Sequence, residues 1–171
     1  MRRAVTLAGL LLVAAAGTMK LQSSDVPAGG IIPTPFMATD CGGHNRSPAL
    51  AWSGAPKGVR SFALIVHDSD APIAGGFYHW VVYNLPAGSR ALPGNAQLSF
   101  GQLGETSLGE QGYHGPCPPP GPAHHYTFTL YALDLAHVAA KAPLTGVQLE
   151  VRIEGHVLAR AVLASTAASN P

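Results

Sequence analysis

The chain has 171 residues, with ten Lys and Arg against nine Asp and Glu, for a formal net charge of +1 at pH 7. This balance excludes the basic surface of a nucleic-acid-binding protein and gives no acidic tail. Hydrophobic residues make up 47% of the chain, and 20 Gly with 15 Pro indicate frequent turns and few long helices. The composition predicts one β-rich domain.

The N-terminus has the pattern of a secretory signal peptide. Arg2 and Arg3 precede an apolar run from Ala4 to Ala16 that ends in small residues. The run has about 13 residues, fewer than the roughly 20 that span a bilayer, so a membrane anchor is the weaker interpretation. We expect a signal peptide at 1–19, a flexible lead-in at 20–30, a domain at 31–164 and a frayed tail at 165–171. The mature protein would be periplasmic or secreted, with no integral membrane segment.

The domain is predicted to consist of short strands separated by turns. A short strand is expected at 50–52, and continuous apolar runs predict buried core strands at 61–66 and 80–85. Clean alternation at 126–133 predicts a third core strand with one buried face. Thr145 can cap a helix that runs to about Ile153, with Val147 and Val151 one turn apart. Residues 156–163 have apolar side chains at both odd and even positions, which favours a strand buried on both faces over a continuation of the helix.

Two acidic residues follow the first core strand, and a histidine begins the second. Asp68 and Asp70 would lie on the same side of an extended segment, about 7 Å apart. The alternative is that both cap backbone N–H groups of a tight turn. His79 would lie at a strand edge, and a carboxylate touching it would favour its charged form, which could donate to an anion.

The segment 112–121 is unusually rich in proline. Between positions 115 and 120 only Gly115 and Cys117 have a backbone N–H, because proline lacks one and has a fixed φ. Such a loop is rigid and suits a preformed anion pocket; the alternative is a polyproline linker or recognition motif. Cys41 and Cys117 lie too far apart in sequence for a metal or redox pair, so a disulfide and two free thiols both remain open.

Two catalytic hypotheses compete with simple binding. Cys117 could act as a nucleophile with a histidine base, or a metal could be held by a set of histidines with Cys117. That set comprises His79, His114, His124, His125 and Cys117. The spacing matches no compact ligand motif, and the chain lacks the common motifs of NTPases, zinc proteases, serine hydrolases and dinucleotide-binding proteins.

Several short motifs resemble, in order, those of one known family. They are NRSPALAWS at 45–53, DSDAP at 68–72, HWVVYNLP at 79–86, GYHGPCPP at 112–119, HYTF at 125–128 and GHVLA at 155–159. The family is that of the phosphatidylethanolamine-binding proteins, in particular its bacterial Raf-kinase-inhibitor-like branch, and the resemblance covers about residues 31–163. Ser69 replaces a usual proline, and 105–109 lacks the usual polar motif.

The resemblance implies a mainly β Greek-key β-sandwich with a few short helices and a small pocket for phosphate-like anions or phospholipid head groups. Its pocket positions fall on Asp68, Asp70, Pro72, His79, Gly115, Pro116, His124 and Tyr126, and the Cys117 amide is added as a donor. We expect a non-enzymatic binding protein without cofactor. It could regulate or inhibit an exported partner protein; the alternative is a hydrolase using Cys117 or a bound metal.

Overall fold

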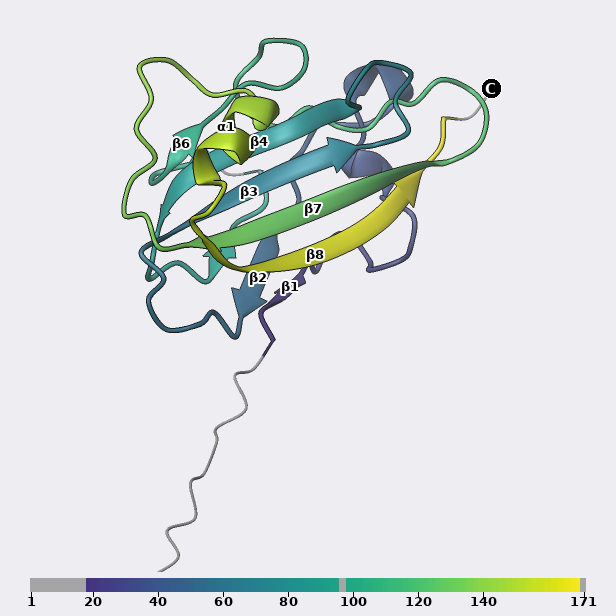
Figure 1. Cartoon of the computed structure of the whole chain (residues 1–171). Coiled ribbons are helices and arrows are strands. Elements are labelled where there is room, and N and C mark those ends of the chain that lie inside the picture. Colours follow the sequence, from purple (N-terminus) through teal and green to yellow (C-terminus); the bar gives the residue numbers. More distant parts are fainter. Residues whose placement is uncertain (1–17, 96–97, 170–171) are drawn as a thin grey trace, which may run out of the picture.

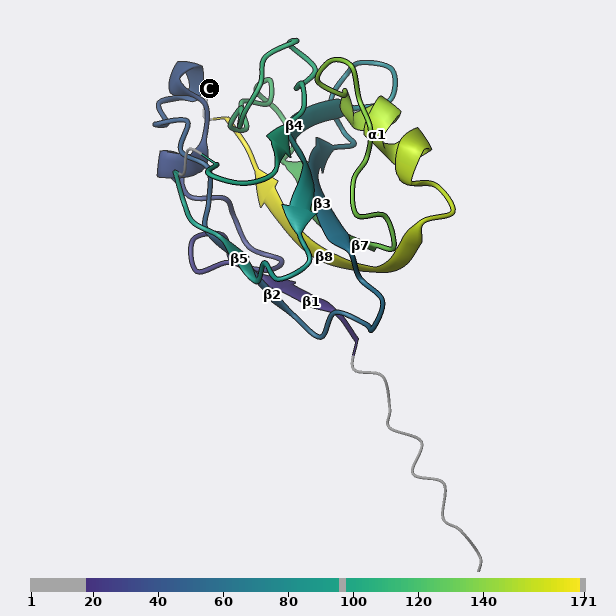
Figure 2. The ribbon, with the colours of Figure 1, turned by 90° about the vertical axis from the view of Figure 1, so that its left-hand side faces the viewer.

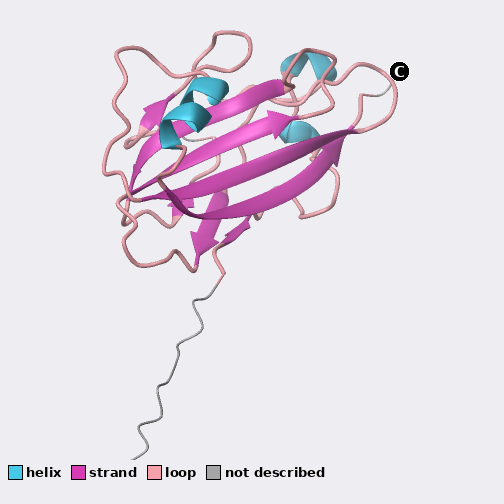
Figure 3. Ribbon diagram, in the orientation of Figure 1, coloured by secondary structure: helices cyan, strands magenta, loops and turns pink. Residues whose placement is uncertain are grey.

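The computed structural model describes residues 18–95 and 98–169, which fold into two packed antiparallel sheets and one short α-helix (Figures 1 and 3). The smaller sheet has the order β1-β2-β5, and the larger has the order β6-β4-β3-β7-β8. The strands are β1 (Lys20–Gln22), β2 (Leu50–Ser53), β3 (Ser61–Asp68), β4 (Phe77–Pro86), β5 (Ala91–Leu92), β6 (Gln102–Leu103), β7 (His124–Leu133) and β8 (Val157–Ala167). The helices are α1 (Gly146–Ile153) and the 3₁₀ turns η1 (Thr34–Phe36) and η2 (Thr39–Cys41). The predicted mainly β sandwich is confirmed.

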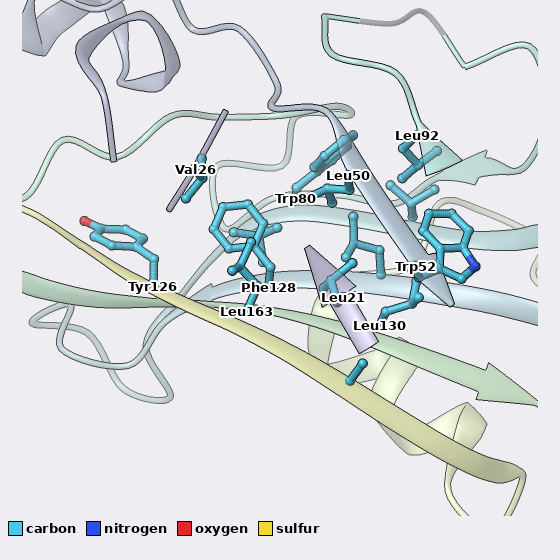
Figure 4. Packing of buried hydrophobic residues seen from close by; sticks show 14 of the residues in the cluster. Leu21, Val26, Leu50, Trp52, Trp80, Leu92, Tyr126, Phe128, Leu130 and Leu163 are labelled. Atoms are coloured by element: carbon cyan, nitrogen blue, oxygen red, sulfur yellow. The ribbon is translucent and has the colours of Figure 1, made fainter. Parts of the chain in front are cut away.

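The main core lies between the two sheets. Trp52 and Leu50 of β2 pack toward Phe128 and Leu130 of β7, as Figure 4 shows. The alternation predicted for β7 is confirmed, because its residues at 126, 128, 130 and 132 are fully buried and the intervening side chains are not. The predicted strands at 50–52, 61–66 and 80–85 are likewise present as β2, β3 and β4.

A second apolar cluster lies between α1 and the other face of the large sheet (Figure 2). Thr145 caps the helix in a capping box with Gln148, as the sequence predicted for its start. The side chains that pack on the sheet are Leu149 and Ile153, which lie one turn apart. Val147 and Val151, the pair that the sequence spaces one turn apart, are both exposed.

Both ends of the domain extend further than predicted. The lead-in expected at 20–30 is ordered by β1, whose Leu21 is buried against the main core. The tail expected from 165 is also wrong, because β8 continues to Ala167 and buries Ser165. In the described part of the chain no helix is long and apolar enough to cross a bilayer. The predicted signal peptide falls largely on residues 1–17, which lie outside the described residues.

Strand β8 is buried on one face only. Ala161, Leu163 and Ser165 point into the core, while Leu158 and Val162 are exposed. The prediction of a strand buried on both faces is therefore wrong for this element. The position of β8 explains this pattern, since it is an edge strand of the large sheet. On the face that points away from the small sheet, α1 lies over β4 and β3 and leaves β8 uncovered (Figure 1).

Candidate functional site

A small pocket lies at the end of the large sheet where β3 ends and β4 begins. Asp68, the last residue of β3, is paired in register with Phe77 of β4 and Tyr126 of β7. This pocket, which we call the His79 pocket, has a volume of about 150 Å³. It is lined by Asp68, Ala71, Pro72, Ile73, Phe77, His79, His114, Cys117, Pro118, Pro119, His124 and Tyr126.

Asp68 uses both carboxylate oxygens within the protein. Oδ1 accepts hydrogen bonds from the backbone N–H groups of Asp70 (2.8 Å) and Ala71 (3.1 Å), which closes the turn after β3. Oδ2 lies 2.8 Å from Nδ1 of His124, and both side chains are largely buried. Asp68 therefore caps the turn and also orients the His124 ring, so Nδ1–H of His124 points at the carboxylate.

His79 is held as a neutral ring. Its Nδ1 lies 2.7 Å from the backbone carbonyl oxygen of His114, and because a carbonyl only accepts, Nδ1 carries the proton and donates. Burial lowers the pKa of His79 to about 4, against the opposing effects of the His114 carbonyl and the Asp68 charge. At neutral pH the free Nε2 is consequently a hydrogen-bond acceptor. The hypothesis that an Asp carboxylate would touch and charge His79 is wrong, because that carboxylate contacts His124 instead.

The hydroxyl of Tyr126 is buried near the Asp68 carboxylate but makes no hydrogen bond of good geometry with any described residue. Its ring meets that of His79 edge-on, with centroids 5.2 Å apart. Burial, together with the nearby Asp68 carboxylate, raises the pKa of the phenol, which therefore stays protonated. A buried donor without a partner is costly, and this one belongs to a residue that lines the pocket.

The proline-rich loop forms one wall of the pocket and is tied to the segment that precedes β2. The N–H of Gly115 donates to Oδ1 of Asn45 (2.7 Å), and the carbonyl of Pro116 accepts from the N–H of Ala38 (3.0 Å). A Cβ on Gly115 would stand 2.4 Å from the carbonyl carbon of Met37, so only glycine allows this close approach. The wall is held in place before any ligand arrives.

A disulfide adds a covalent tie to the same wall. Cys41, at the end of η2, is bonded to Cys117, and their Cα atoms are 5.5 Å apart. The hydroxyl of Ser169 donates to the carbonyl of Pro118 at 2.5 Å. With Cys117 bonded in this way, the nucleophile hypothesis has no thiol at that position. Residues 18–95 and 98–169 also contain no cluster of three or more His, Cys, Asp or Glu that could hold a metal.

Six of the nine predicted site residues line the pocket: Asp68, Pro72, His79, Cys117, His124 and Tyr126. Asp70 does not, because its Oδ2 turns outward and accepts from both the backbone N–H (2.8 Å) and Nδ1 (2.6 Å) of His125. The hydrogen bond from the His125 ring holds the pKa of the Asp70 carboxyl below its ordinary value. Gly115 and Pro116 do not line the pocket, and the N–H of Gly115 donates to Oδ1 of Asn45.

Sequence reasoning missed part of the lining. His114 supplies the carbonyl that holds His79, and the Phe77 ring packs at a tilt against that of His79 with ring centroids 4.5 Å apart. Ile73, which is 50% exposed, stands at the rim. The sequence could have predicted Phe77, because it lies two residues before His79 and side chains two residues apart in a strand are on the same face.

Comparisons with known proteins agree with this architecture. A family model described as phosphatidylethanolamine-binding protein matches residues 22–168. The Escherichia coli protein YbhB is 38% identical over 151 residues, which are 84% of this chain and 96% of YbhB. The crystal structure of Escherichia coli YbcL, titled as a new member of the mammalian PEBP family, has a TM-score of 0.85 at 30% identity and covers 90% of this chain and all of that one. The Chlamydia trachomatis homologue CT736 has a TM-score of 0.78 at 37% identity, covering 87% and 96%.

Proposed function

The chain belongs to the phosphatidylethanolamine-binding protein family, and we propose that its His79 pocket binds the phosphoryl group of a small phosphoester without catalysis. The family name supports a phosphorylated ligand. The small volume of the pocket, about 150 Å³, supports a group of phosphate size.

The observation that carries this proposal is the buried Tyr126 hydroxyl, which makes no hydrogen bond of good geometry although the Asp68 carboxylate lies near it. A phosphoryl oxygen is a strong acceptor that would satisfy it, and Nε2 of His124, whose ring is oriented by the contact of Nδ1 with Asp68, is the other nitrogen available to the same ligand. Neutral His79 presents an acceptor instead. The proposed ligand therefore carries its own donor beside the phosphoryl group, either an acidic P–OH or an ammonium.

We further propose that the protein acts in an oxidising compartment, in the periplasm or outside the cell. Two observations support this: the signal-peptide pattern of residues 1–19, and the Cys41–Cys117 disulfide, a bond that persists in such compartments and is rare in the cytosol.

Titration calorimetry with phosphorylethanolamine, compared with dimethyl phosphate, tests the binding proposal. Dimethyl phosphate offers acceptors but no donor, so we expect it to bind more weakly. The variant His79→Asn keeps an N–H for the His114 carbonyl and removes the Nε2 acceptor. Loss of a hydrogen bond to a charged group predicts about tenfold or more weaker binding of phosphorylethanolamine.

The matched control is His156→Asn, because His156 pairs with Asp134 far along the sheet and does not line the pocket. It should bind phosphorylethanolamine like the wild type. Equal affinity of wild type and His79→Asn, or no binding of either phosphoester to the wild type, would overturn the proposal.

A further inference from the structure

A larger hollow lies between α1 and the loop that leads into it. We call it the Arg152 groove; its volume is about 660 Å³, within the roughly 300–1,000 Å³ of small-molecule sites. Its walls are the loop 139–145, the side chains of Gln148 and Arg152 on α1, and Glu105 on the segment after β6. It shares no lining residue with the His79 pocket, so the two hollows are separate sites.

Three charged side chains line the Arg152 groove, and they come from three different segments. Lys141 belongs to the loop, Arg152 to the last turn of α1, and Glu105 is the only carboxylate of the lining. The ion pairs formed within 18–95 and 98–169 all use histidine, so neither cation is paired with Glu105. One hollow therefore presents a carboxylate and two cations that do not neutralise one another by direct contact.

Hydrogen bonds hold the walls in place and leave these charges available. Nη1 of Arg152 donates to the carbonyl oxygen of Ala139 (3.0 Å), which fixes the guanidinium beside the loop while its other N–H groups can still donate. The N–H of Glu105 donates to the carbonyl oxygen of Leu144 (2.9 Å). The backbone, not the carboxylate, thus ties Glu105 to the loop.

The wall between the charges is made of small apolar side chains. The loop contributes alanine at positions 139, 140 and 142, followed by Pro143. These side chains add no further charge and can contact a short methylene chain.

From this arrangement we propose that the Arg152 groove binds a small zwitterion, with its carboxylate on Arg152 and Lys141 and its ammonium on Glu105. The ligand class is that of amino acids and related aminocarboxylates. A guanidinium matches a carboxylate with two parallel hydrogen bonds, and an ammonium donates up to three to a carboxylate such as that of Glu105. A dianion would place a negative charge near Glu105, which like-charge repulsion disfavours.

A series of ω-aminocarboxylates tests the inference, because its members carry the same two charges at increasing separation. The series is glycine, β-alanine, γ-aminobutyrate, δ-aminovalerate and ε-aminocaproate. Valerate and pentylamine, each with one of the two charges, are the matched controls for δ-aminovalerate. Titration followed by amide NMR spectra measures weak binding and identifies the amides that respond.

We expect one length of the series to bind best and to shift the amide signals of residues 139–148. Valerate and pentylamine should bind about fivefold weaker than the best member of the series, as for the loss of one exposed ion pair.

The variants Glu105→Gln and Lys141→Gln each remove one charge of the groove. Each should weaken binding of the best ω-aminocarboxylate about fivefold. The controls Glu154→Gln and Arg160→Gln remove the same kinds of charge from exposed positions outside the groove. Both controls should bind like the wild type.

Three results would overturn the inference. The first is that no ω-aminocarboxylate binds better than valerate and pentylamine. The second is a response confined to amides outside 139–148, and the third is wild-type affinity in either Glu105→Gln or Lys141→Gln. None of these probes carries a phosphoryl group, so each result leaves the proposal for the His79 pocket as it stands.

Discussion

Replacing Tyr126 with phenylalanine should stabilise the ligand-free protein. The hydroxyl is buried beside Asp68 without a hydrogen bond of good geometry, and an unsatisfied buried polar group costs about 1–3 kcal/mol. Phenylalanine keeps the ring that packs edge-on against His79 with centroids 5.2 Å apart. We therefore expect the free energy of unfolding to rise by about 1 kcal/mol, which corresponds to about 2–4 °C in Tm for a chain of this size.

The same substitution should weaken ligand binding, because it removes the donor proposed to contact the phosphoryl group. A hydrogen bond to a charged group contributes about 1.5–3 kcal/mol, so the affinity for phosphorylethanolamine should fall at least tenfold. Thermal unfolding followed by circular dichroism, with and without phosphorylethanolamine, measures both effects. Tyr126→Phe should start at a higher Tm and gain less from the ligand than the wild type.

Tyr113→Phe provides the contrast. The Tyr113 hydroxyl donates to the Phe36 carbonyl at 2.7 Å and lies outside the pocket lining. Its loss should destabilise the protein by about 1 kcal/mol and leave the ligand-induced gain in Tm unchanged. A lower Tm for ligand-free Tyr126→Phe, or an undiminished ligand effect, would refute the reasoning from the unpartnered hydroxyl.

Two further predictions concern pH and the disulfide. The pKa of His79 is about 4 in the folded protein and 6.5 in its ordinary state, so between these values the unfolded chain binds more protons and stability falls as the pH falls. Urea denaturation should show a loss of up to about 3 kcal/mol between pH 7 and pH 4 that is absent in His79→Asn; parallel curves would contradict the buried neutral ring. Cys41 and Cys117 are 76 residues apart, so the double variant Cys41→Ser/Cys117→Ser should lower the free energy of unfolding by about 4 kcal/mol. It should also weaken phosphorylethanolamine binding, measured by calorimetry in urea-free buffer. Unchanged affinity would show that the proline-rich wall of the pocket needs no covalent tie.

The elements predicted correctly are those whose pattern depends on local physics. The strands β3, β4 and β7 follow from apolar runs and alternation, and α1 begins at a residue that can cap it. The strand β1 was missed because Lys20–Gln22 is short and mostly polar, and its pairing with β2 and the burial of Leu21 depend on segments distant in sequence. The exposed Val162 of β8 was misassigned because an edge strand that α1 leaves uncovered carries an apolar outer residue.

The site shows the same division. Asp68 and His79 could be assigned to one pocket because strand ends and family motifs place them together. Their hydrogen-bond partners could not be predicted, since these come from segments distant in sequence: Asp68 meets His124, 56 residues away, and His79 meets the His114 carbonyl, 35 residues away. For that reason Asp70 was expected inside the pocket, although it binds His125 outside it.

The chemistry of the pocket follows from the groups that the fold leaves unused. Both oxygens of Asp68 and Nδ1–H of His79 are engaged within the protein. The Gly115 amide, once an expected anion donor, is engaged as well. The polar atoms of the lining that these contacts leave unused include the Tyr126 hydroxyl, Nε2 of His124 and the accepting Nε2 of His79. A bare anion would leave the His79 acceptor unpaired, whereas a phosphoester with its own acidic proton or ammonium could pair it as well as the Tyr126 hydroxyl, so the neutral state of His79 selects among ligands of similar size and charge.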